Sequence, residues 1–124
     1  MNMKLELVPL SVSDADESIA FYEKKIGFHL DHDVQPGNGM RIVQLTPPGS
    51  ACSIAFGTGM GDGKSLVYGL HLVVDDIAKV RQTLIDREVE VSNISDMGGV
   101  KYAYFSDPDG NTWALQEISH TARP

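Results

Sequence analysis

The chain has 124 residues, of which 42% are hydrophobic, and a formal net charge of −7. This length and composition predict one globular domain with a buried apolar core. Because neither half of the chain is basic, we expect no nucleic-acid partner. The single cysteine excludes an intrachain disulfide, and the lack of a signal-like or membrane-spanning segment predicts a cytoplasmic protein without a membrane partner.

The beginning of the chain predicts a strand followed by an amphipathic helix. Residues 5–12 alternate between apolar and polar positions as in a half-buried strand. Either Ser13 or Asp14 then offers a side-chain oxygen to the first turn of a helix, and Gly27 supplies the left-handed residue that ends it. The apolar stripe of this helix is predicted at Ile19, Tyr22 and Ile26.

The middle of the chain predicts a hairpin and then a linker. Residues 45–49 are a strand that enters a Pro/Gly turn, and residues 53–56 are a second apolar strand. Residues 57–63 contain too many glycines for a packed element. We therefore expect a first module at 1–57 and a flexible glycine-rich linker at 58–66.

The second half of the chain repeats the order of the first after about sixty residues, which indicates two copies of one unit. Asp75 or Asp76 caps a second helix, but Glu88 stands where a terminating glycine is expected. A left-handed Glu88 would cost about 1 kcal/mol. With a second module at 67–120, the chain is predicted to form an α+β fold in which two βαβββ modules build a curved mixed sheet around a concave cup.

Strand alternation predicts which side chains face this cup. The predicted ligand-binding residues are Leu7, Pro9, Gln44, Ser53, His71, Tyr102, Tyr104 and Gln116. The tyrosines are interpreted either as a stacking wall for a flat or cationic ligand or as ordinary half-buried strand residues. Gln44 and Gln116 are expected to face each other from equivalent strands and to suit a neutral, hydrogen-bonding small molecule.

His71 and Tyr104 are the candidate catalytic residues. His71 is interpreted as a pocket histidine that binds the ligand or acts as a general base, as a structurally satisfied histidine, or as a metal ligand. Arg41 is either an anion clamp at one end of the cup or a member of a surface salt bridge.

The chain resembles the vicinal oxygen chelate superfamily, which includes glyoxalase I, extradiol dioxygenases, fosfomycin-resistance enzymes and bleomycin-resistance proteins. The resemblance covers nearly the whole chain. It is carried by Val12-Ser13-Asp14, Ala20-Phe21-Tyr22, Ile26-Gly27-Phe28, Val74-Asp75-Asp76-Ile77 and residues 105–113. These motifs indicate the superfamily rather than any one activity within it.

The resemblance also implies four positions for a divalent cation, one on each of four strands. Metal-dependent members bind the cation there with His or Glu, and the matching positions in this chain are Leu7, Ala55, Gly69 and Ala114. None of these side chains donates an electron pair to a metal. We therefore expect no metal and no cofactor.

Two classes of function remain. The first is a metal-free binding protein, similar to the bleomycin-resistance proteins, that holds an aromatic or glycosylated metabolite or antibiotic. The second is a metal-independent isomerase, lyase or hydrolase that acts on a secondary metabolite, and a glyoxalase-like metalloenzyme with displaced ligands is a third alternative. By resemblance to short members of the superfamily, the chain is expected to form a homodimer.

Overall fold

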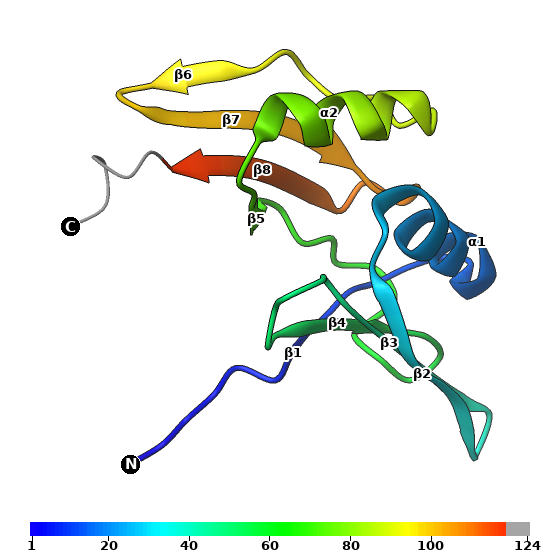
Figure 1. The fold of residues 1–124 in the computed structure, drawn as a ribbon. Coiled ribbons are helices and arrows are strands. Elements are labelled where there is room, and N and C mark those ends of the chain that lie inside the picture. The colour runs from blue at the N-terminus through cyan, green and yellow to red at the C-terminus, as the bar shows by residue number, and fades with distance from the viewer. Residues whose placement is uncertain (119–124) are drawn as a thin grey trace. The chain divides into compact units, whose positions relative to one another are not determined.

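A computed structural model of the chain describes residues 1–118. The chain divides into two compact units, Met1–Val67 and Tyr68–Pro124. Each unit consists of a strand, a helical segment and three further strands (Figure 1). Residues 119–120 of the predicted second module lie outside the described range.

The first unit contains a mixed four-stranded sheet in the order β1-β4-β3-β2. Strand β1 pairs with β4 in parallel, and the other two pairs are antiparallel. Its elements are β1 (Leu7–Pro9), α1 (Ala15–Ile19), the π-helix η1 (Ala20–Ile26), β2 (His29–Gly37), β3 (Met40–Thr46) and β4 (Ser53–Phe56).

The second unit has the same order of pairing in a sheet of strands β5-β8-β7-β6. Strands β5 and β8 are parallel, and the other two pairs are antiparallel. Its elements are β5 (Leu70–Val73), α2 (Ile77–Asp86), β6 (Ser95–Met97), β7 (Val100–Ser106) and β8 (Thr112–Ile118). The prediction of an α+β fold made of two βαβββ modules is confirmed.

Strand β1 is shorter than the predicted strand at residues 5–12. Its partner β4 has only four residues, so the parallel ladder is short. The flanking backbone hydrogen bonds, Ser53 N–H to Glu6 O at 2.9 Å and Leu10 N–H to Ala55 O at 2.8 Å, mark its two ends. Leu5 lies beyond the ladder and is exposed.

Both helical segments begin at a capping aspartate. The Asp14 carboxylate accepts the backbone N–H of Glu17, and the Asp76 carboxylate accepts that of Lys79, each at 3.1 Å. These bonds satisfy N–H groups that have no partner within the helix. Gly27, with φ of 93°, ends the first segment as predicted. Glu88 has φ of 65° and is therefore left-handed without being a glycine.

The first helical segment widens into η1 after one short α-helical stretch, which the sequence pattern does not predict. The carbonyl of Tyr22 accepts the backbone N–H of Gly27, five residues further on, at 2.9 Å. Tyr22 is fully buried, and its ring lies 5.5 Å from that of Phe28 and 6.1 Å from that of Phe56 on β4. The η1 segment therefore covers one face of the first sheet with an aromatic cluster.

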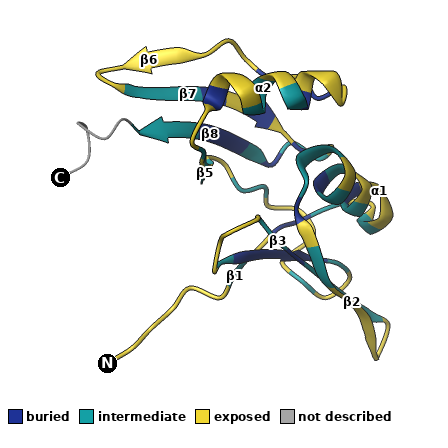
Figure 2. Cartoon of the chain, viewed as in Figure 1, coloured by how far each residue is buried: buried dark blue, intermediate teal, exposed yellow. Residues whose placement is uncertain are grey.

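Each unit has its own apolar core. Figure 2 shows that buried residues concentrate in the inner strands, whereas β2 and β6 are largely exposed. The buried apolar residues of the first unit are Leu10, Tyr22, Phe28, Val43, Leu45, Ile54, Ala55 and Phe56. Those of the second are Ile77, Leu84, Val89, Val91, Ala103, Phe105, Trp113, Ala114 and Leu115. Within residues 1–118, no helix is long and apolar enough to cross a membrane.

The glycine-rich segment has more internal structure than its composition predicts. The Asp62 carboxylate accepts the backbone N–H groups of Lys64 and Ser65 at 2.8 and 2.7 Å, the Ser65 hydroxyl, and the Ser11 hydroxyl at 3.2 Å. These bonds, first among them those of Ser65, hold the pKa of Asp62 well below its usual range. Asp62 thus fastens the segment to the end of β1.

Gly57 is the tightest point of this segment. It has φ of 125°, and a Cβ built on it would lie 2.2 Å from the carbonyl oxygen of Arg41. The next residue, Thr58, accepts the backbone N–H of Arg41 at 3.0 Å, so the two backbones are held together. Only glycine fits this close approach.

We predict that Gly57→Ala destabilises the protein by at least about 2 kcal/mol, because left-handed strain adds to a backbone clash. Gly63→Ala is the matched control. Gly63 has φ of 72° but no heavy atom within 4 Å of a built Cβ, so only the strain of about 1 kcal/mol applies. Urea denaturation measures both, and equal losses of stability would contradict the close-approach argument.

Candidate functional site

In each unit the helical segment covers one face of the sheet, and the opposite face is here called the open face. On the second unit, the Glu117 carboxylate accepts the backbone N–H of Ile77 at 2.9 Å, which assigns Glu117 to the helix side. Alternation along the strands then places His71, Tyr102, Tyr104 and Gln116 on the open face. Four of the predicted site residues therefore share one surface.

His71 is exposed, and its Nδ1 lies 2.6 Å from the carbonyl oxygen of Gly69. A carbonyl only accepts hydrogen bonds, so Nδ1 carries a proton. The neutral imidazole therefore keeps Nε2 unprotonated, and Nε2 has no partner among the described residues. This arrangement supports a hydrogen-bond acceptor or general base at His71.

The two tyrosines form an aromatic surface beside His71. The His71 and Tyr102 rings are nearly perpendicular, with centroids 6.1 Å apart, and the Tyr102 and Tyr104 rings lie within 4° of parallel at 6.3 Å. The Gln116 amide donates to the Tyr102 hydroxyl at 3.2 Å. Tyr104 is 49% exposed, so a large part of its ring is accessible.

Val73 and Met97 extend this surface. Val73 is 60% and Met97 64% exposed, and strand register puts both on the same face as Tyr102. Met97 was not among the residues predicted to line the site. The Gly98-Gly99 sequence that follows Met97 is typical of a tight hairpin turn and would have predicted the pairing of Met97 with Val100 on β7.

On the first unit, Ser53 belongs to a chain of polar groups across the open face. Its Oγ lies 2.7 Å from the Thr46 hydroxyl, which donates to the Asp31 carboxylate. His29 Nδ1 lies 2.8 Å from the same carboxylate. The Thr46 hydrogen bond, followed by His29, holds the pKa of Asp31 below its usual range. Ser53 itself is buried.

The other site residues predicted on the first unit lie along two strands. Leu7 pairs with Ser53, and Pro9 pairs with Ala55 across the parallel ladder. Leu7 is half-buried and Pro9 is exposed. Gln44 pairs with Ala55 from the antiparallel side, and its amide donates to the Glu6 carboxylate at 3.3 Å.

The expectation that Gln44 and Gln116 occupy equivalent strands is wrong. Gln44 on β3 pairs with Ala55 on β4. In the second unit, Tyr104 on β7 pairs with Ala114 on β8. Tyr104 is therefore the equivalent of Gln44, and Gln116 belongs to β8. Gln44 precedes the Pro/Gly turn of the first unit and Gln116 follows that of the second, so the two side chains belong to different strands of the repeat.

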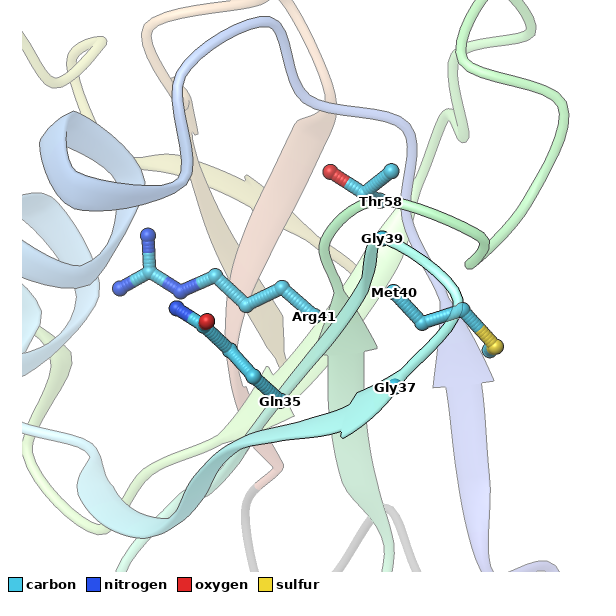
Figure 3. A pocket seen from close by; sticks show the side chains of 6 residues that line it. All are labelled: Gln35, Gly37, Gly39, Met40, Arg41 and Thr58. Atoms are coloured by element: carbon cyan, nitrogen blue, oxygen red, sulfur yellow. The ribbon is translucent and has the colours of Figure 1, made fainter.

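Arg41 is part of a surface salt bridge, as one of its two interpretations predicts. Its guanidinium donates twice to Asp33 and once to Asp16, all at 2.9 Å. The hydrogen bonds to Arg41 lower the pKa of Asp33. Arg41 also lines a cavity of about 320 Å³ with Gln35 and Thr58 (Figure 3). Because two carboxylates already neutralise it, Arg41 is a poor anion clamp.

The residues at the four positions implied for a divalent cation cannot bind such an ion. Leu7 and Ala55 in the first unit, and Gly69 and Ala114 in the second, carry no donor side chain. Within residues 1–118, no three His, Cys, Asp or Glu side chains lie close enough together to hold a metal ion.

A profile of the Glyoxalase/Bleomycin resistance protein/Dioxygenase superfamily matches residues 4–115. The chain belongs to this superfamily, and the resemblance inferred from its sequence is confirmed. A comparison with curated proteins gave no match.

Solved structures of the same superfamily are similar over nearly their whole length. The antibiotic binding protein TnmS3 from Streptomyces sp. CB03234 is 31% identical, with a TM-score of 0.81 over 95% of this chain and 98% of that one. A superfamily member from Sphaerobacter thermophilus DSM 20745 is 32% identical, with a TM-score of 0.83 over 94% and 98%. A glyoxalase/bleomycin resistance protein from Streptomyces sp. CB03234 is 33% identical, with a TM-score of 0.74 over 90% and 98%.

We predict that Thr46→Val raises the pKa of Asp31, because it removes the hydroxyl that does most to stabilise the ionised carboxylate. A carboxyl whose pKa is lower in the folded than in the unfolded protein stabilises the fold at pH values above the unfolded-state pKa of about 3.9. This stabilisation is lost as the pH falls through the folded-state pKa. The variant should therefore lose less stability on acidification. Carboxyl-carbon NMR titration measures the shift, with Asp33 as the internal control, and an unchanged Asp31 would contradict the prediction.

Proposed function

We propose that this chain is a metal-free, cytoplasmic binding protein for an aromatic or glycosylated small molecule. The observation that carries the proposal is the open face of the second unit. There, the exposed Tyr104 ring lies parallel to Tyr102 and beside the unpartnered Nε2 of His71. An aromatic surface with a few polar groups is typical of sites that bind small organic ligands.

Stacking on the tyrosines supplies most of the expected affinity. Each aromatic contact adds about 0.5 to 1.5 kcal/mol beyond the burial of apolar area. Val73 and Met97 widen the surface with exposed apolar groups, and methionine adapts to ligands of irregular shape. The likeness to a protein described as antibiotic binding supports the same class of ligand.

Binding is favoured over turnover by what surrounds His71. Catalysis by proton transfer needs a base, an acid and a group that stabilises developing charge, arranged around one reacting atom. The open face of the second unit offers His71 as a base and tyrosine hydroxyls as acids, but its strands, all within residues 70–118, carry no fixed cation there to stabilise developing charge. A metal-independent isomerase, lyase or hydrolase is therefore the second candidate, supported by the acceptor state of His71 Nε2.

We predict that His71→Ala and Tyr104→Ala each weaken binding of a ligand found by thermal-shift screening, by about five- to tenfold, because each removes one contact of about 1 kcal/mol. Isothermal calorimetry measures the affinities. Tyr68→Ala is the matched control, since Tyr68 is even more exposed, at 72%, and lies before β5.

Leu115→Ala separates the site from the core. Leu115 is 1% exposed, so its truncation should lower stability by about 2 to 5 kcal/mol. Unchanged affinity in both the His71 and the Tyr104 variants would reject the open face of the second unit as the binding site.

We further propose that the protein is a homodimer. Strands β2 and β6 end their sheets, and a second copy that covers such edges prevents uncontrolled association. A native mass spectrum is expected to show twice the chain mass of 13.5 kDa without added metal. A monomer would contradict the dimer, and one transition-metal ion per chain would contradict the metal-free state.

A further inference from the structure

Resting on the binding function proposed above, we infer that the open face of the second unit selects a ligand whose aromatic body carries a hydrogen-bond donor, a hydroxyl or an ammonium group. His71 creates this preference. Its Nδ1 proton is engaged by the Gly69 carbonyl at 2.6 Å, so the neutral ring offers the ligand only the lone pair of Nε2.

Gln116 adds a second acceptor to the same face. Its amide nitrogen donates to the Tyr102 hydroxyl at 3.2 Å, and this leaves the amide oxygen without a partner among the described residues. Strand β8, which carries Gln116, lies between β5, which carries His71, and β7, which carries Tyr102. Both acceptors therefore lie on the same side of the tyrosines, where a ligand stacked on these rings meets them along one edge.

No fixed charge competes with His71 on this face of the second unit within the described residues. The groups packed around it are Ala114 and Gln116 on β8 and Tyr102 and Tyr104 on β7. The nearby carboxylates are used elsewhere or lie off the strand. Glu117 faces the helix side, where its carboxylate accepts the backbone N–H of Ile77 and lies 3.8 Å from the Lys101 ammonium. Asp76 caps α2, and Asp75 lies beyond the end of β5.

Protonation of His71 reverses the preference. In a protonated imidazole both ring nitrogens carry hydrogen, so Nε2 is then a cationic donor and no longer an acceptor. Binding is compared at about pH 8 and at about pH 5.5. Affinity for a donor ligand should then fall, and affinity for an acceptor ligand should rise. Opposite responses to pH distinguish this mechanism from a general loss of folding, which would weaken both.

The test uses three naphthalene derivatives substituted at the same ring position: naphthylmethylammonium, naphthol and naphthoate. None of them changes protonation state over this pH range. Dissociation constants come from proton–nitrogen correlation spectra of the full chain. From the upper to the lower pH we expect about fivefold weaker binding of the ammonium compound, weaker binding of naphthol, and about fivefold tighter binding of naphthoate.

Two variants assign the effect. His71→Ala should abolish the opposite pH responses, whereas His32→Ala, which removes an exposed histidine on β2, should retain them. Nitrogen chemical shifts of the His71 ring report the tautomer directly, and a proton on Nε2 rather than Nδ1 in the neutral ring would overturn the inference. A pH response confined to the ammonium compound would also overturn it, because repulsion between two cations would then explain the data.

The proposed function and the inference fail in different ways. If all three compounds bind, weaken in Tyr104→Ala and show no opposite pH responses, the aromatic site stands and donor selection is rejected. If none of them perturbs the resonances of Tyr102 or Tyr104, both the aromatic site and donor selection are rejected.

Discussion

The parallel pairing of the first and last strands is the constraint on which each unit depends. Parallel neighbours cannot be joined by a tight turn, so the chain must cross over one face of the sheet, and here it does so through a helical segment. That crossover buries one face, around Tyr22 and Phe56 in the first unit and under α2 in the second. The other face of each sheet carries no helical segment of its own unit.

Strand alternation then divides the side chains of the second unit between two faces. Phe105, Trp113 and Leu115 are buried on the helix side, whereas Tyr104 on the same hairpin is half exposed. Small residues between the large ones shape the open face as well. Ala114 has only a methyl group between His71 and Tyr104, so the neighbouring rings dominate this part of the open face. This face therefore presents aromatic rings and a few hydrogen-bonding groups, and no cluster of metal-ligating side chains lies among residues 1–118.

The local features of the fold were predictable because their causes are local. Asp14 and Asp76 cap helical segments through bonds to residues three positions away, and Gly27 ends the first segment through its own backbone conformation. The two modules were readable from the repeated order of strands and turns. The register of the first hairpin was not, since its bulges shift the pairing between Leu30 and His32 and between Val34 and Gly37. The error in matching Gln44 to Gln116 has a different cause, because Gln44 precedes the Pro/Gly turn of the first unit whereas Gln116 follows that of the second.

The sequence by itself determined the superfamily, the two modules and which strand residues share a face, because periodicity and capping act over a few residues. It also determined that Leu7, Ala55, Gly69 and Ala114 cannot ligate a metal. Only the tertiary structure decided which polar atoms are already used: Arg41 by Asp16 and Asp33, Asp62 by the segment it fastens, and His71 Nδ1 by Gly69. The pairing of Arg41 with Asp16 joins segments distant in sequence. The bonds of Asp62 to Ser65 and of His71 to Gly69 are local, but they depend on side-chain rotamers, which the sequence pattern does not encode. For that reason the acceptor state of His71 became visible only once the strands were in place.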